Sequence, residues 1–130
     1  MITLRVSGCA IVQDGKLLLR LRKRDTMYEF PGGTVEKGET LVQAALREVE
    51  EEVDCKVIII KEAASYAQVK RPDLRLKLYV HLARLVEGQV PREMEPQEFG
   101  ELVWMPIFDY LKYPLASNVK KFCEEYRATL

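Results

Sequence analysis

The stretch GGTVEKGETLVQAALREVEEEVD, from Gly32 to Asp54, determines how the rest of this chain is interpreted. Thr40 is a plausible helix N-cap, and apolar residues recur after it at helical spacing as far as about Val53. At roughly 100° per residue these side chains cover an arc of about 140°, which predicts a helix with one buried face. That face comprises Leu41, Val42, Ala45, Leu46, Val49 and Val53.

The same helix concentrates negative charge. Glu48, Glu50, Glu51 and Glu52 lie within five consecutive residues. In helical projection Glu48, Glu51 and Glu52 fall within about 100° of one another, whereas Glu50 projects roughly 160° away from Glu52. Such crowding destabilises a helix, most of all near its C-terminus. An acidic, solvated surface is one interpretation; the other is a site where a hard divalent cation binds among three carboxylates and bridges phosphate oxygens.

Hydrophobic patterning on either side of this helix predicts strands and one further helix. Asp14-Gly15 is typical of a tight hairpin turn, and Pro72-Asp73 indicates a second hairpin tip. We expect strands over Leu4–Val12, Lys16–Leu21, Val57–Val69 (irregular near Ala63–Tyr66), Leu74–Ala83 and Glu101–Met105, a polar loop over Glu87–Phe99, and a helix over Ser117–Ala128. The order β-β-α-β-β-β-α predicts an α+β fold in which helices flank a mixed sheet.

Composition limits the class of protein. With 130 residues, 48% apolar and 31% charged, the chain is expected to form a single domain over residues 1–130. Twenty basic and twenty acidic residues cancel, so we expect neither a nucleic-acid polymer nor a membrane as partner. Cys9, Cys55 and Cys123 are dispersed and His81 is the single histidine, which argues against zinc and predicts buried free thiols in a cytoplasmic protein.

The glycine loop and the acidic helix together resemble a known signature. Gly33, five intervening residues, Glu39, seven intervening residues and then Arg47-Glu48-Val49-x-Glu51-Glu52 have the spacing of the signature of Nudix hydrolases. The preceding Glu29-Phe30-Pro31-Gly32 is typical of that family. The resemblance implies a Nudix-type α/β/α sandwich with a mixed sheet between helices. One position departs, because Asp54 stands where the family usually has a helix-terminating glycine.

The C-terminal part of the chain extends the resemblance. The segments 98–104 and 113–116 are similar to those of MutT-like nucleoside triphosphate pyrophosphohydrolases, especially the branch that acts on cytidine and oxidised nucleotides. The implied reaction is magnesium-dependent (or manganese-dependent) hydrolysis of a nucleoside triphosphate to a monophosphate and pyrophosphate. ADP-ribose or dinucleoside polyphosphate hydrolysis and a non-catalytic nucleotide-binding module remain alternatives. The expected partner is a small-molecule nucleotide, and the protein is expected to be a monomer or a homodimer.

The resemblance also implies roles for individual residues. Metal ligands would be Gly32, through its backbone carbonyl, Glu48, Glu51, Glu52 and Glu98. Glu48 is alternatively the base that activates water, and Arg47 would orient Glu39 or Glu51. Glu98 is selected from the loop before the last strand, with Glu95 and Glu101 as alternatives.

Substrate contacts are expected from two groups of residues. Arg20, Arg22, Lys23 and Arg24 form a basic cluster, within which Arg22 is preferred as the phosphate contact because it alternates with core-facing leucines. Base recognition is expected to involve Phe30, Tyr79, Ser117 and Asn118. Solubilising surface is the competing interpretation of the basic cluster, and ordinary core packing is that of Phe30 and Tyr79.

Overall fold

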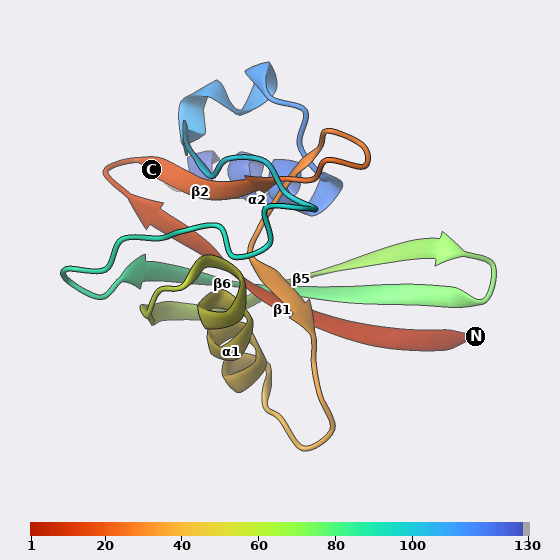
Figure 1. The fold of residues 1–130 in the computed structure, drawn as a ribbon. Coiled ribbons are helices and arrows are strands. Elements are labelled where there is room, and N and C mark those ends of the chain that lie inside the picture. The colour runs from red at the N-terminus through yellow and green to blue at the C-terminus, as the bar shows by residue number, and fades with distance from the viewer. Residues whose placement is uncertain (129–130) are drawn as a thin grey trace.

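A computed structural model describes residues 1–128 of the chain as strands and helices around one mixed sheet (Figure 1). The elements in chain order are β1 (Ile2–Gln13), β2 (Lys16–Leu21), β3 (Tyr28–Glu29), β4 (Gly32–Thr34), α1 (Leu41–Val53), β5 (Val57–Arg71), β6 (Leu74–Leu85), β7 (Val103–Pro106), the 3₁₀ helix η1 (Ile107–Lys112) and α2 (Ser117–Ala128). The sequence predicted the bounds of β2, α1 and α2 correctly and those of the other long elements to within a few residues. It missed the short strands β3 and β4 and the helix η1.

Strand β1 is the centre of the sheet. The strand order is β3-β2-β1-β6-β5, with β4 paired to β1 and β7 paired to β2. Strands β1 and β6 run parallel from the pair Ile2–Leu74 to the pair Ile11–Ala83, while the other pairs are antiparallel. The predicted mixed sheet is therefore confirmed.

The two α-helices pack against opposite faces of the sheet. Because side chains alternate along a strand, Ala10 of β1 joins a core cluster with Val119 and Phe122 of α2. Its neighbours Cys9 and Ile11 join a second cluster with residues of α1. The result is the expected α/β/α sandwich.

Both ends of α1 are fixed by local hydrogen bonds. Thr40 Oγ1 accepts from the Gln43 N–H at 3.0 Å, and the Gln43 side chain accepts from the Thr40 N–H at 2.9 Å, forming a capping box. Asp54 ends the helix in the left-handed conformation (φ 52°, ψ 44°) and donates its N–H to Glu50 O. Aspartate thus adopts the conformation for which the resemblance leads one to expect glycine.

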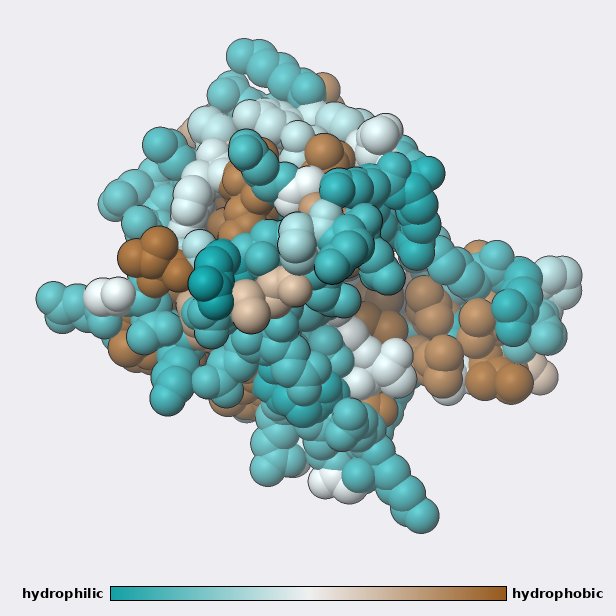
Figure 2. All heavy atoms as spheres, viewed as in Figure 1, coloured by the Kyte–Doolittle hydropathy of each residue, from teal (hydrophilic) through white to brown (hydrophobic). Residues whose placement is uncertain are grey.

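One end of the sheet projects beyond the helices. It consists of the first half of β1 and the hairpin of β5 and β6, and we call it the ribbon (residues 2–6, 65–71 and 74–79); it lies on the right of Figure 1. Apolar side chains lie on its surface in Figure 2, and Ile2 and Val69 are 58% and 61% exposed. The Ile2 N–H donates to Asp73 O at 2.7 Å, which ties β1 to the hairpin tip.

A long connection crosses the C-terminal end of α1. We call residues 86–102 the strap; its Arg92 and Met94 N–H groups donate to Val53 O and Glu52 O at 2.8 and 3.0 Å. These bonds satisfy carbonyls that a helix end otherwise leaves unpaired. The strap therefore lies against the acidic part of α1. Within residues 1–128 no helix has the length and apolar character needed to cross a membrane.

Candidate active site

Strand β4 brings the glycine loop against the glutamates of α1. The Gly32 N–H donates to Glu52 Oε1 at 2.7 Å. The next residue, Gly33, lies directly on the Glu48 carboxylate, so that an added Cβ would be 2.6 Å from Glu48 Oε2. Two of the three glutamates predicted to face the same way are therefore held beneath the backbone of β4.

Arg47 ties together the remaining acids of the signature. Its guanidinium donates to both oxygens of Glu39 (2.7 and 3.0 Å), to Glu48 Oε1 (2.9 Å) and, at 3.3 Å, to Glu51 Oε2. A further bond at 3.1 Å reaches Thr34 O next to the glycines. The Arg47 hydrogen bonds hold the pKa of Glu39 below its usual value. The expected ion pairs of Arg47 with Glu39 and Glu51 are both present.

Arg20 is in an environment that the sequence analysis did not foresee. Its side chain is fully buried, and its guanidinium lies 3.6 Å from the ring centroid of Phe99. It donates to Glu52 Oε2 at 2.7 Å, to both oxygens of Glu93 at 2.9 and 2.7 Å, and to Glu95 at 3.1 Å. The expectation that Arg20 belongs to an accessible basic cluster is wrong, because β2 is buried on both faces at this point.

The four acids of α1 differ in burial: the helical projection predicts the exposure of Glu50 but groups Glu51 with the two acids that are buried. Glu50 and Glu51 are exposed, whereas Glu48 and Glu52 are mostly buried. Burial raises the pKa of Glu52 to about 8, with Glu48 and Glu95 adding to the rise and Arg20 opposing it. Burial also raises the pKa of Glu48. Arg20 is shared among Glu52, Glu93 and Glu95, and Arg47 among Glu39, Glu48 and Glu51. Carboxylates therefore outnumber the arginines, and an added cation would neutralise the excess negative charge.

The donor set fits a hard divalent cation. Among residues 1–128 no three acidic, histidine or cysteine side chains converge into a preassembled metal centre; Arg20 and Arg47 bind the carboxylates instead. All the donors are nevertheless oxygens, and two of them belong to carboxylates whose pKa is raised by burial. Mg²⁺ and Mn²⁺ prefer such ligands.

The acid expected from the strap is placed differently from its neighbours. Glu98 is exposed, its carbonyl accepts from the Lys23 N–H at 3.0 Å, and its side chain makes no ion pair within the described part of the chain. Glu93 and Glu95 instead reach Glu52 through Arg20. Sequence reasoning missed Glu93, since a run with several glutamates in a loop does not reveal which of them points inward.

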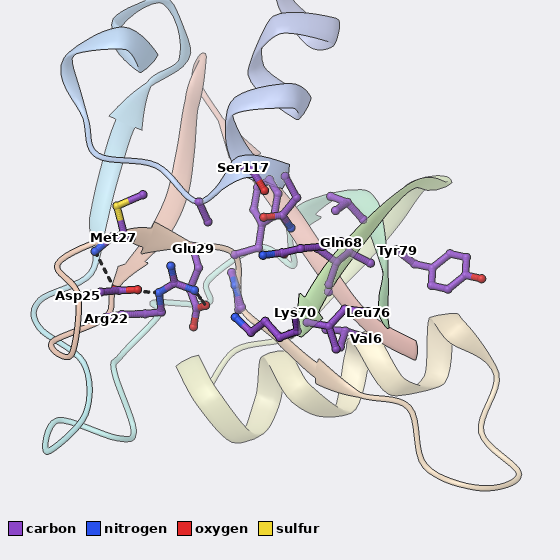
Figure 3. Close-up of a pocket in the computed structure, with 18 of the residues that line it drawn as sticks. Val6, Arg22, Asp25, Met27, Glu29, Gln68, Lys70, Leu76, Tyr79 and Ser117 are labelled. Atoms are coloured by element: carbon purple, nitrogen blue, oxygen red, sulfur yellow. Dashed lines mark hydrogen bonds and ion pairs between the residues drawn. The ribbon is translucent and has the colours of Figure 1, made fainter. Parts of the chain in front are cut away.

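A cavity of about 510 Å³ opens beside these glutamates (Figure 3). Its floor includes Val6, Leu76 and Leu78 of the ribbon, and the start of α2 closes one side with Ser117 and Asn118. The segment between β2 and β3, together with β3 itself, forms the opposite wall with Arg22, Arg24, Asp25, Met27 and Glu29. Gly32 lines the cavity and also binds Glu52, so the cavity adjoins the acidic helix.

All five predicted substrate residues line this cavity, in different ways. Arg22 donates to Asp25 at 3.1 Å and to Glu29 at 3.3 Å, and Ser117 and Asn118 lie at the helix start. The Phe30 ring is mostly buried, edge-on to Phe122 at 5.6 Å. The Tyr79 ring points away from the cavity in Figure 3.

Four polar residues of the lining were not predicted as substrate contacts: Asp25, Glu29, Gln68 and Lys70. Burial raises the pKa of Glu29. Glu29 was noted only as part of the signature, and Gln68 and Lys70 belong to a strand whose bulges obscure which side chains face the same way.

Comparison with known proteins agrees with this geometry. The family model of the NUDIX domain matches residues 2–126. The chain is 29% identical over 117 residues to the CTP pyrophosphohydrolase of Escherichia coli (strain K12), covering 87% of this chain and 83% of that protein. It is 35% identical over 98 residues to the 8-oxo-dGTP diphosphatase of the same organism, covering 72% of this chain and 74% of that protein.

Solved structures show the same fold. The crystal structure of a MutT NUDIX hydrolase from Burkholderia pseudomallei superimposes with a TM-score of 0.85 at 28% identity, covering 95% of this chain and 98% of that one. The match of the family model over nearly the whole chain, on a fold of this type, shows that the chain belongs to the NUDIX domain family.

Proposed function

We propose that this enzyme hydrolyses a nucleoside triphosphate to the nucleoside monophosphate and pyrophosphate, with a divalent metal ion. As a Nudix hydrolase it cleaves a phosphoanhydride bond. The observation that carries the finer proposal is the position of Gly32, which lines the cavity and hydrogen-bonds the buried Glu52. A nucleotide in the cavity would thus have its phosphates beside the glutamates of α1.

The metal would be held by the Gly32 carbonyl and by Glu48, Glu51 and Glu52, with Glu98 or Glu95 contributing from the strap. When bound, Mg²⁺ or Mn²⁺ would neutralise the phosphate oxygens and lower the pKa of a coordinated water. Arg47 orients Glu39, Glu48 and Glu51 relative to one another. Glu48, whose pKa is raised by burial, is the preferred base for the attacking water, because β4 holds its carboxylate in place.

The cavity supports a nucleotide as the substrate. Apolar side chains of the ribbon offer a surface for a flat base, and Arg22, Arg24 and Lys70 supply positive charge for phosphates. Ser117, Asn118 and the partly buried carboxylate of Glu29 offer polar groups to the edge of the base. The names of the relatives, CTP pyrophosphohydrolase and 8-oxo-dGTP diphosphatase, favour a cytidine or oxidised nucleotide.

Glutamine substitutions on α1 test the catalytic part of the proposal. Glu48→Gln and Glu52→Gln should each lower kcat by about 10²-fold to 10⁴-fold while far-UV circular dichroism remains unchanged. Glu50→Gln is the matched control, because it removes the same charge from an exposed position of the same helix. Equal activities in all three variants would refute a catalytic role for the buried acids.

A substrate panel tests the rest. CTP, its deoxy form and 8-oxo-dGTP would be incubated with Mg²⁺ beside ADP-ribose and diadenosine polyphosphates, and the released phosphate species identified. We expect pyrophosphate from a triphosphate. Hydrolysis of ADP-ribose or a dinucleotide alone would refute the triphosphate assignment, and binding of nucleotide without turnover would indicate a non-catalytic module.

A further inference from the structure

We propose that Arg20 is a positioning residue for the reaction: it fixes the orientation of Glu52 and couples the strap to whatever Glu52 binds. The inference rests on the proposed function, because it takes Glu52 as a ligand of the metal. It concerns an arginine outside the signature and two acids of the strap.

The first step is the burial of the arginine. A fully buried guanidinium is stable only where carboxylates and hydrogen-bond acceptors compensate its charge. Arg20 has such partners on two separate elements: Glu52 on α1, and Glu93 and Glu95 on the strap. The ring of Phe99, also in the strap, packs against the face of the Arg20 guanidinium. Arg20 therefore has little freedom to move unless one of these elements moves.

The second step is the orientation of Glu52. One of its oxygens accepts from the Gly32 N–H and the other from Arg20, each at 2.7 Å. These two bonds set the plane and direction of the carboxylate. Hydrogen-bonding partners behind a metal ligand commonly fix its orientation and influence metal affinity. Arg20 has this relation to Glu52.

The third step is the coupling to the strap. Glu93 accepts two parallel bonds from Arg20, and its Oε2 also accepts from the Glu95 N–H at 3.0 Å. The Met94 N–H, between these acids, donates to the backbone carbonyl of Glu52 itself. The strap thus contacts the backbone of Glu52 directly, through the Met94 N–H, and contacts the side chain of Glu52 indirectly, through Arg20. A change in what Glu52 coordinates would alter the same bonds that hold residues 93–95.

The test is a pair of charge-preserving or size-preserving substitutions. Arg20→Lys keeps the positive charge but loses the planar fork that binds Glu52 and Glu93 together. Glu93→Gln keeps the size of the side chain but removes its negative charge, and it replaces one of the two carboxylate oxygens that accept from Arg20 by an amide group that cannot accept. Arg92→Lys is the matched control, because Arg92 lies in the same strap and, among residues 1–128, its side chain pairs only with the exposed Asp54, at 3.2 Å.

We expect Arg20→Lys to weaken Mn²⁺ binding by about 10-fold to 100-fold, as measured by electron paramagnetic resonance without nucleotide. Its kcat should fall in parallel while KM for the nucleotide stays near that of the wild type. Glu93→Gln should change both quantities in the same direction, and Arg92→Lys should match the wild type. If Arg20→Lys does not fold, the Mn²⁺ affinity and kcat of Glu93→Gln alone decide whether Arg20 positions Glu52.

Hydrogen exchange provides a readout that does not depend on turnover. Mg²⁺ should slow exchange of the Arg92 and Met94 amides in the wild type, and this protection should be lost in Glu93→Gln. Folded variants with wild-type Mn²⁺ affinity, or an Arg92→Lys variant with the same loss, would overturn the role of Arg20. If the wild type itself neither binds Mn²⁺ nor turns over nucleotide, the proposed function fails instead.

Discussion

Replacing Gly33 by alanine should separate activity from stability. A Cβ at this position would lie 2.6 Å from Glu48 Oε2 and even closer to the other atoms of that carboxylate. These atoms are the far end of a flexible side chain, so the backbone of β4 does not have to move. The carboxylate must retreat by roughly 1 Å before its contact with the new methyl group becomes an ordinary van der Waals contact.

The size of the effect follows from that displacement. Moving a reacting group by about 1 Å can cost about 10²-fold in rate, which corresponds to roughly 2.7 kcal/mol of transition-state stabilisation. The free energy of unfolding should change little or rise, because alanine in a strand is favoured over glycine by roughly 0.5–1 kcal/mol. We therefore expect a folded protein with normal thermal stability and a kcat reduced about 100-fold.

The neighbouring glycine supplies the contrast. A Cβ on Gly32 would lie 2.7 Å from Gly8 Cα and 2.9 Å from Ser7 O, which are backbone atoms of β1. Gly32→Ala should therefore destabilise the fold by about 1–3 kcal/mol. Both variants would be compared by thermal unfolding and by steady-state kinetics. Wild-type kcat in Gly33→Ala, or an equal loss of stability in both variants, would refute the reasoning.

Three further predictions concern stability. Burial raises the pKa of the Cys9 and Cys123 thiols to about 12 and that of Cys55 to about 11; because the folded state holds these protons more tightly, stability should be complete below about pH 9 and fall above it, by up to about 1.4 kcal/mol per pH unit for each thiol. Urea unfolding from pH 8 to 10.5 measures this, and a thiol reagent that titrates all three cysteines of the native protein at pH 8 would contradict it. Asp54→Val should lower the free energy of unfolding by about 1–2 kcal/mol, because the cap is left-handed, whereas Asp54→Gly should not lower it; equal melting temperatures for the two variants would argue against the cap. Thr40→Ala removes the capping box of α1 and should cost about 1 kcal/mol in denaturant unfolding, and a variant as stable as the wild type would show that Gln43 alone suffices.

The sequence predicted those parts of the site that depend on local spacing. The bounds of α1, the solvated position of Glu50 and the pairing of Arg47 with Glu39 all follow from residues close together in the chain. Helical periodicity and the signature carry this information directly. The long strands were likewise recognisable, because alternation over ten residues is a strong pattern.

The parts that were missed depend on contacts between distant segments. Strands β3 and β4 have two and three residues, too few for any period, and exist because they pair with β2 and β1. Arg20 was assigned to the surface because a charged residue beside Arg22 suggests exposure, whereas the strap buries it. Its partner Glu93 is 73 residues away in the chain, a separation over which no local pattern extends.

The two-faced sheet has a consequence for changing what the enzyme accepts. Leu76 and Leu78 of β6 form part of the cavity, while their neighbour His81 is buried on the α1 side, hydrogen-bonded to Ser7 at 2.9 Å. Directed evolution restricted to every second codon of this strand would thus vary the lining of the proposed nucleotide site and spare the residues that pack on the α1 side. The lining of the cavity can in this way be varied while the residues around α1 stay unchanged.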